Sequence, residues 1–267
     1  MGDSGSWRSP RRLLLLAVGA ATVVFLVGPM LVVIPMGFTS SPILSWPPEG
    51  FSLRWYEKMV TDPQWSRGFL NSLQVASLTA ILSTVLGTPA ALGIARGRFP
   101  GKSLVNALML SPLIVPVIII ALGFFAFFVR FKLTGSIVGL VLAHTALAVP
   151  FVVINVGTVL RTMDRTLELA AANLGADPMA TFRRITLPII FPGVVTGALF
   201  AFITSWDEVV VSIFMTTARF RTLPVEMWEQ VRQVVDPTVA AVATVVMLVT
   251  TTVLTLVFVA RKQAPVR

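Results

Sequence analysis

Cysteine is absent from this 267-residue sequence, and histidine occurs once, as His144. Without a thiol, the chain has neither a disulfide framework nor a thiolate nucleophile. A single imidazole cannot build a histidine metal cluster, so we predict no metal site, and we expect no cofactor. Charged residues make up 12% of the sequence, whereas a soluble domain has about 25%. These absences exclude cysteine chemistry and a histidine metal centre, and they argue against a soluble protein.

Long apolar runs accompany this scarcity of charge, and 55% of the residues are hydrophobic. A helix of roughly 20 apolar residues spans a bilayer. We therefore predict an all-α integral membrane protein with six transmembrane helices, at about 13–37, 69–95, 104–128, 137–160, 189–214 and 238–260. The first run is too long for the core of a signal peptide, so we expect an uncleaved anchor.

The 21 lysines and arginines are divided unevenly between the two sets of loops that six spans create. One set holds 13 of them and the other holds 8. By the positive-inside rule the richer set faces the cytoplasm. It consists of the N-terminal segment 1–12, the loops 96–103 and 161–188, and the tail 261–267. This topology places both termini in the cytoplasm and explains the net charge of +9, so nucleic acid is not an expected partner.

Three local patterns refine the predicted spans. Pro112 and Pro116 are expected to kink the third span, because proline lacks a backbone donor. The fifth span begins with a small residue at every fourth position across 193–201, which favours close helix packing, either within the chain or against a second subunit. On the outer side, residues 225–235 are typical of a short surface helix.

A polar stretch, LELAAANLGADPMATFRRITLP at 167–188, interrupts the apolar spans. Asp164 can cap a first short helix, and Gly175 occupies the position where a left-handed residue ends such a helix. Asp177 and Pro178 are typical of the start of a second helix. The apolar stripe of the first helix is Leu167, Ala170, Ala171 and Leu174. Such a hairpin could rest on lipid headgroups, but its small, alanine-rich stripe favours a protein groove.

The same passage resembles the EAA loop of binding-protein-dependent ABC importer permeases. That pattern is E-A-A, three residues, G, about nine residues and then I-x-L-P. Here Ala170-Ala171, Gly175 and the segment 185–188 reproduce the spacing. In that family the loop forms coupling helices that dock into a groove of a cytoplasmic ATPase subunit. The resemblance therefore implies a coupling role for Glu168, Ala170, Ala171, Gly175, Asp177 and Pro188.

One position departs from the family pattern. Leu169 stands where the family has its glutamate, and the acid lies one residue earlier, at Glu168. One residue is a rotation of about 100° on a helix. We therefore expect Glu168 to make a modified contact.

The resemblance extends over nearly the whole chain and is strongest to the spermidine/putrescine permeases, chiefly through SWDEVVVSIF and RFRTLPVEMW. It implies a type I importer permease fold in a bacterial inner membrane. The implied partners are an ABC ATPase dimer, an extracytoplasmic solute-binding protein, membrane lipid and a second permease subunit, expected to be a different chain. The stretch RGRFPGKS at 96–103 is not a nucleotide loop, because three residues separate its glycines where the Walker pattern needs four. We therefore expect a separate subunit to hydrolyse ATP.

Polar side chains inside the spans are costly and mark candidate sites. Asp207 and Glu208 are the clearest intramembrane charges, and a carboxylate there could offer a counter-charge to a cationic substrate. We predict a substrate pathway that includes Asp207, Glu208, Trp206, Asn71 and His144. The alternative is structural: Glu208 pairs with a neighbouring helix or loop, and His144 and Asn71 form hydrogen bonds between helices.

Two function classes compete with the predicted importer permease for a polyamine. A self-sufficient secondary transporter or channel would use Asp207 and His144 as an ion relay, but the capped hairpin has no role in it. A membrane-embedded hydrolase would need a nucleophile with a base, or a set of metal ligands, and neither is evident. Within the importer class, other organic cations, amino acids and sugars remain alternative substrates. We predict a transport subunit and not an enzyme.

Overall fold

The computed structural model of the protein describes residues 10–233 and 236–262. Its regular elements there are helices, and the only β-pairing in the described ranges is an isolated bridge between Thr217 and Phe220. The α-helices are α1 (Pro10–Met36), α2 (Arg54–Thr61), α3 (Pro63–Arg96), α4 (Lys102–Leu110), α5 (Val117–Arg130), α6 (Ile137–Thr162), α7 (Thr166–Asn173), α8 (Pro178–Thr181), α9 (Leu187–Trp206), α10 (Val210–Met215), α11 (Leu223–Gln233) and α12 (Thr238–Lys262).

Five of the described helical segments are long and apolar enough to cross a membrane. A sixth span results if the bent pair formed by residues 102–113 and 117–130 is counted as one. The all-helical membrane fold is therefore confirmed for the described residues, and their five or six spans are close to the expected six. By contact, the chain divides into two units, residues 1–62 with 230–248 and residues 63–229 with 249–267, which we describe separately.

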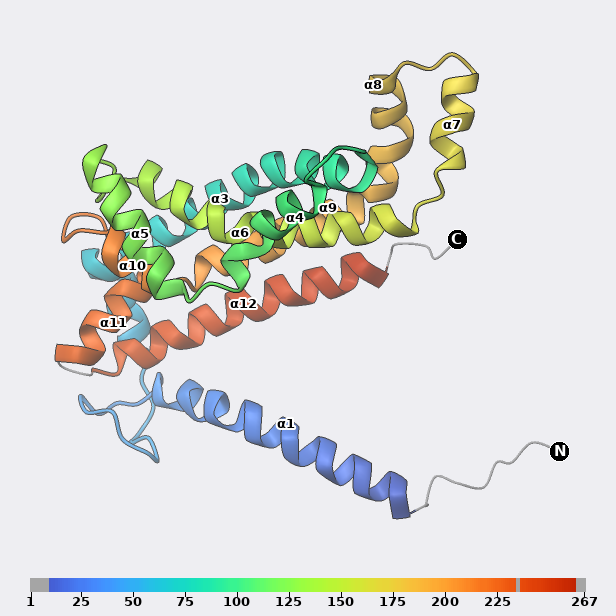
Figure 1. The fold of residues 1–267 in the computed structure, drawn as a ribbon. Coiled ribbons are helices and arrows are strands. Elements are labelled where there is room, and N and C mark those ends of the chain that lie inside the picture. Colours follow the sequence, from blue (N-terminus) through green and yellow to red (C-terminus); the bar gives the residue numbers. More distant parts are fainter. Residues whose placement is uncertain (1–9, 234–235, 263–267) are drawn as a thin grey trace. The chain divides into compact units, whose positions relative to one another are not determined.

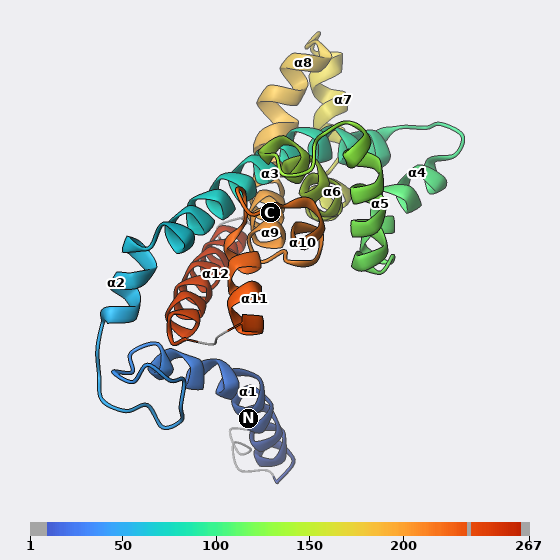
Figure 2. The ribbon, with the colours of Figure 1, turned by 90° about the vertical axis from the view of Figure 1, so that its left-hand side faces the viewer.

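The centre of the larger unit is a bundle of three long helices, α3, α6 and α9, each packed against the other two (Figures 1 and 2). Glycines allow the close approach of α9 to α6. A Cβ atom at Gly197 would lie 2.9 Å from the Cα of Val152, and one at Gly193 would lie 3.0 Å from the carbonyl oxygen of Asn155. The predicted small-residue ladder of the fifth span therefore packs within the chain, because any side chain at these glycines would collide with α6.

The third predicted span is broken and not merely kinked. A 3-10 turn at Ser111–Leu113 follows α4, and α5 then leaves at an angle of 99°. Pro112 lies in the 3-10 turn, and Pro116 is the N-cap residue of α5. Two prolines so close together remove two backbone donors and disfavour the helical conformation of the residues before them. The helix therefore ends and starts again.

The fifth span differs from its predicted bounds at both ends. Residues 178–206 form one continuous helical run, in which a π-helical segment, Phe182–Thr186, joins α8 to α9. Pro188 lies in the first turn of α9, where proline is tolerated. At the other end, α9 stops at Trp206 and α10 begins at Val210. The prediction of one helix through 189–214 is therefore wrong.

The smaller unit contains α1, the loop that follows it, α2 and the first part of α12. The Trp55 indole N–H donates to the carbonyl oxygen of Thr39 at 2.8 Å, which fixes α2 against the loop. Lys58 forms an ion pair of 2.6 Å with Asp236. A Cβ atom at Gly37 would lie 3.0 Å from the Cα of Ala241, so the end of α1 approaches the start of α12 closely.

Candidate functional site

The polar stretch after α6 folds into the predicted hairpin, with the short helix α7 as one arm. The second arm, α8, is not a separate helix as predicted, because it continues through the π-helical segment into α9. Figures 1 and 2 both show α7 and α8 projecting beyond the ends of α3 and α6. The Asp164 carboxylate accepts from the N–H of Thr166 at 2.9 Å. Gly175 has φ +81°, the left-handed conformation that ends α7, and Asp177 accepts from the N–H of Ala180 at 2.8 Å. The predicted roles of Gly175 as the left-handed residue that ends α7 and of Asp177 as the cap of α8 are therefore confirmed.

Large apolar side chains remain exposed on this hairpin. Leu174 is 88% exposed and Leu169 is 62% exposed, and Leu167 and Met179 are exposed as well. Backbone hydrogen bonds hold Leu174 in place, since its N–H lies 3.1 Å from the carbonyl oxygens of Ala170 and Ala171. A fixed, projecting and apolar surface is typical of a site that a partner covers.

Glu168 does not share this exposed surface. One oxygen of its carboxylate accepts from the Thr186 hydroxyl at 2.8 Å, and the other lies 3.2 Å from Nη2 of Arg96. Nearby, Nη2 of Arg165 donates to the carbonyl oxygen of Ala95 at 3.0 Å. Glu168 therefore ties the hairpin to the end of α3 and to the π-helical segment before α9. The exposed position belongs to its neighbour, Leu169.

The other residues assigned to coupling occupy different places in the hairpin. Ala171 is buried and Ala170 is exposed, so the predicted stripe does not lie on one covered face of the isolated chain. Asp177 is occupied as a helix cap. Pro188 is exposed at the start of α9.

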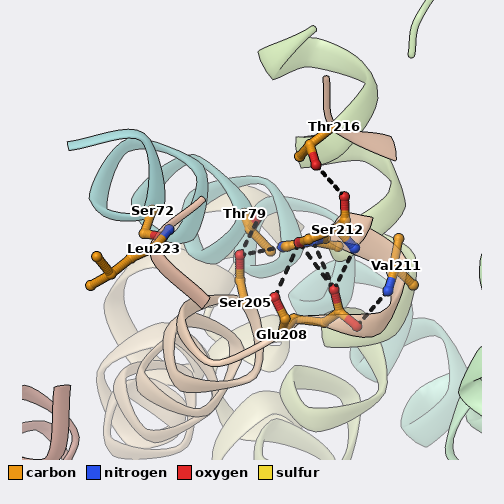
Figure 3. A network of polar contacts seen from close by, with 9 residues as sticks. Ser72, Thr79, Ser205, Glu208, Val211, Ser212, Thr216 and Leu223 are labelled. Carbon is orange, nitrogen blue, oxygen red and sulfur yellow. Dashed lines mark hydrogen bonds and ion pairs between the residues drawn. The ribbon is translucent and has the colours of Figure 1, made fainter. Parts of the chain in front are cut away.

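A second concentration of polar side chains lies between the three bundled helices and α10 (Figure 3). His144, on α6, is 1% exposed. Its Nδ1 lies 2.7 Å from the Ser205 hydroxyl of α9, and its Nε2 lies 3.1 Å from the Ser212 hydroxyl of α10. The same Nε2 lies 3.3 Å from the Glu208 carboxylate. Ser205 in turn donates to Thr79 on α3 at 3.4 Å, so this polar network connects four helices.

Glu208 fills its acceptor positions within the chain. Its two oxygens accept from the N–H groups of Val211 and Ser212 at 2.8 and 2.9 Å, so the side chain caps the start of α10 (Figure 3). The Glu208 side chain is 8% exposed. The structure thus favours the structural alternative for Glu208 and His144. Sequence reasoning did not single out Ser205 and Ser212, although two hydroxyls flanking an intramembrane carboxylate were a usable signal.

The remaining pathway candidates divide between the interior and the surface. Trp206 is buried between the rings of Phe69 and Phe202. Asn71 is half-buried and donates to the carbonyl oxygen of Arg221 at 2.8 Å. Asp207, at the C-terminal end of α9, is exposed. Of the two adjacent carboxylates at this end of α9, Asp207 is therefore the exposed one.

Glu226 forms a polar cluster that sequence reasoning also missed. It is a buried residue on α11, and it accepts from the Gln64 amide at 2.6 Å. Its carboxylate lies 3.5 Å from Nη1 of Arg221. The N–H of Leu223 donates to Ser72 at 2.8 Å, so the start of α11 is fastened to the start of α3. The predicted short helix after the fifth span is thus anchored by buried polar contacts.

Five or six apolar spans and a projecting capped hairpin define the class of the protein, which is a multi-pass membrane protein. The family described as "Binding-protein-dependent transport system inner membrane component" matches residues 83–263, and the chain belongs to this family. The predicted family resemblance is therefore confirmed. The protein is an ABC importer permease and a multi-pass inner-membrane protein.

The relatives and the similar structures agree with this assignment. The chain is 33% identical to the putrescine transport system permease protein PotI of Escherichia coli K12, over 90% of this chain and 86% of the relative. It is 32% identical to the spermidine/putrescine permease PotC of Haemophilus influenzae, over 77% and 79%. The molybdenum transport permease ModB of Mycobacterium bovis is 34% identical, over 72% and 77%. A bacterial ABC transporter for the import of alginate has the same fold, with a TM-score of 0.70 at 13% identity, covering 98% of this chain and all of that one.

Proposed function

We propose that this permease carries a polyamine, such as putrescine or spermidine, and that ATP hydrolysis by partner subunits drives the transport. The exposed apolar surface of the hairpin supports ATP coupling, because its backbone is fixed while its leucines lack a covering partner in the isolated chain. The similarity to PotI and PotC over most of the chain supports a polyamine as the solute. The proposed assembly contains a second permease subunit, two ATPases and an extracytoplasmic binding protein.

The proposed coupling path begins at the hairpin. Leu174, Leu169 and Met179 would enter a groove of the ATPase, and hydrophobic burial would hold them there. Because α8, the π-helical segment and α9 form one continuous run, a displacement of the hairpin would be transmitted along residues 178–206. Contacts of Glu168 with Arg96 and Thr186 would make the end of α3 follow the same displacement.

The path ends where α9 stops. Ser205 and Glu208 flank this end and connect it to α6 and α10 through His144. A movement of α9 would therefore displace Asp207, and α6 and α10 would move with it. Its exposed carboxylate would provide a transient counter-charge for an ammonium group when the outer side of the pathway opens. This is an alternating-access mechanism, in which the permease itself makes and breaks no covalent bond.

The proposed topology assigns each segment to one side of the membrane. The distribution of basic residues supports a topology with the hairpin and both termini in the cytoplasm, by the positive-inside rule. The α11 segment and the Glu226 cluster would then lie on the outer side, within reach of a binding protein.

The coupling experiment uses the full transporter, co-expressed with its ATPase and purified through a tag on this chain. Leu174→Glu places a charge on the proposed docking surface and should abolish retention of the ATPase. Val231→Glu is the matched control, because Val231 is exposed on α11 and lies outside the hairpin. Retention of the ATPase by the Leu174→Glu variant would contradict docking through this surface. If the wild-type chain retained no ATPase and putrescine uptake persisted without ATP, the chain would instead be a secondary transporter.

The solute experiment measures uptake into proteoliposomes together with the binding protein. Putrescine, spermidine, an amino acid and molybdate form the panel, since the relatives include both polyamine and molybdenum permeases. We expect uptake of a polyamine, and Asp207→Asn should lower it without reducing thermal stability. Transport of molybdate and not of either polyamine would overturn the solute assignment and leave the importer assignment intact.

A further inference from the structure

A cavity of about 1090 Å³ lies where the C-terminal ends of α3 and α6 meet the start of α4. Four basic side chains line it, and the lining contains no carboxylate: Arg96, Lys102, Arg161 and Arg165. They come from four separate places in the chain, namely the end of α3, the start of α4, the last turn of α6 and the segment after it. Two of them belong to the stretch at 96–103 that fails the pattern of a nucleotide loop.

The positive charges in this cavity are poorly compensated by the chain. Lys102 donates to the carbonyl oxygen of Gly97 at 3.1 Å, and Arg165 donates to that of Ala95 at 3.0 Å, so both are held by neutral groups. Arg96 has a carboxylate partner in Glu168, at 3.2 Å from its Nη2. The Nε of Arg96 is nevertheless buried and has no hydrogen-bond acceptor among the described residues.

This arrangement fits an anion with several oxygen atoms. Like charges gathered around one cavity repel each other, and an anion inside it would reverse that cost. Guanidinium groups present planar sets of N–H donors that match phosphate oxygens. A buried, unoccupied N–H beside the cavity adds a donor that a phosphate oxygen could satisfy.

The cavity also has an apolar part. Ile94, Leu110, Val153 and Ile154 contribute to its walls, together with the small residues Ala91 and Gly157. These residues belong to spans that a bilayer surrounds, and the basic side chains lie at the ends of those spans, at the depth of lipid headgroups. A free phosphate ion has no part that an apolar wall would bind, whereas a phospholipid has both a charged head and hydrocarbon chains.

We propose that this cavity binds an anionic phospholipid, with its phosphate among Arg96, Lys102, Arg161 and Arg165 and its acyl chains along the apolar wall. The site is independent of the transported solute. It lies beside the Arg96–Glu168 contact that ties the hairpin to α3. A bound lipid would therefore occupy the space next to the proposed coupling path.

The test measures retention of phosphatidylglycerol by the purified full-length protein in detergent, using native mass spectrometry. The Lys102→Gln/Arg161→Gln double variant should bind phosphatidylglycerol about tenfold more weakly, since two charge-assisted contacts are lost. Arg183→Gln/Arg184→Gln is the matched control, because it removes the same charge at exposed positions that do not line the cavity. The charge-preserving Lys102→Arg/Arg161→Lys variant should retain the lipid.

A second variant fills the cavity without changing charge. Gly157 lines the cavity, and a Cβ atom built on it meets no heavy atom within 4 Å. Gly157→Leu should therefore lower phosphatidylglycerol retention while thermal stability stays at the wild-type level.

Three outcomes would overturn the proposal. Equal loss in the cavity variant and the control would show a general charge effect. Unchanged retention in both cavity variants would show that the lipid binds elsewhere. Displacement of the lipid by millimolar inorganic phosphate, with direct phosphate binding that the double variant loses, would assign the site to a soluble anion.

Discussion

The hairpin at 164–188 and the polar network around His144 both contain a glutamate beside a basic side chain, but the two regions differ in what they leave exposed. Glu168 is 24% exposed and lies next to leucines that face away from the chain. Glu208 is 8% exposed and is surrounded by hydrogen-bond partners. A charge within a span is thus a poor indicator of a pathway when its partners are internal, whereas exposed apolar residues on a rigid hairpin indicate a partner.

The largest expected effect is on the free energy of unfolding, which should depend more on Glu208 than on Glu168. Glu208→Ala should lower the free energy of unfolding by about 2–6 kcal/mol, because two backbone N–H groups of α10 lose their acceptor, and each buried unsatisfied donor costs about 1–3 kcal/mol. Thermal unfolding of the purified protein measures the change. Glu208→Gln keeps one acceptor oxygen and should lose less. If Glu208→Ala kept the wild-type stability but lost polyamine uptake, Glu208 would belong to the pathway and its structural role would be wrong.

A backbone change should act on the hairpin alone. Gly175→Val forces a β-branched residue into the left-handed conformation, at a cost of about 1–2 kcal/mol, so the corner should distort and uptake should fall. Membrane insertion should be unchanged, as measured by the yield of folded protein. Gly93→Val is the matched control, since Gly93 lies in α3 where a Cβ atom meets open space. Unchanged uptake by Gly175→Val would contradict a coupling role for the corner.

Glu168 sharpens the distinction between docking and transmission. If it ties the hairpin to the spans, Glu168→Ala should retain the ATPase but slow the uptake. A double-mutant cycle with Thr186→Val, measured on the free energy of unfolding, should show a coupling energy of about 0.5–1.5 kcal/mol, which is the net contribution of one hydrogen bond. Loss of the ATPase from Glu168→Ala, to the same extent as from Leu174→Glu, would show that Glu168 docks directly.

The smallest expected effect is the pH dependence of stability that Asp236 contributes. This carboxylate lies in the smaller unit and is paired with Lys58. Burial alone would raise its pKa, but hydrogen bonds from Lys58 and Thr238 and the Lys58 charge lower the pKa below its ordinary value. A lowered pKa stabilises the folded state above the unfolded-state pKa, and this contribution is lost as the pH falls through the lower folded-state value. Thermal unfolding between neutral and acidic pH should therefore show a weaker acid sensitivity for Asp236→Asn than for the wild type. Identical pH profiles would exclude a contribution from this ion pair.

The local features of this protein could be predicted from the sequence. Span lengths follow from apolar runs, and the corner of the hairpin follows from Gly175, Asp177 and Pro178, because caps and left-handed glycines depend on residues within one or two turns. The displaced acid at Glu168 was also visible, although its partners were not. These features were predictable because neighbouring residues determine them.

Only the tertiary structure decided which polar residues are satisfied and which surfaces are left open. His144 meets Ser205 and Ser212 across 61 and 68 residues of sequence, and Glu168 meets Arg96 across the whole of the third and fourth spans. The break at 207–209 and the 99° bend of the third span likewise depend on how packed helices accommodate an interrupted backbone. Hydrophobic length specifies a span without specifying its neighbours, so the partners of a buried carboxylate and the cations that share a cavity emerge only when the helices pack.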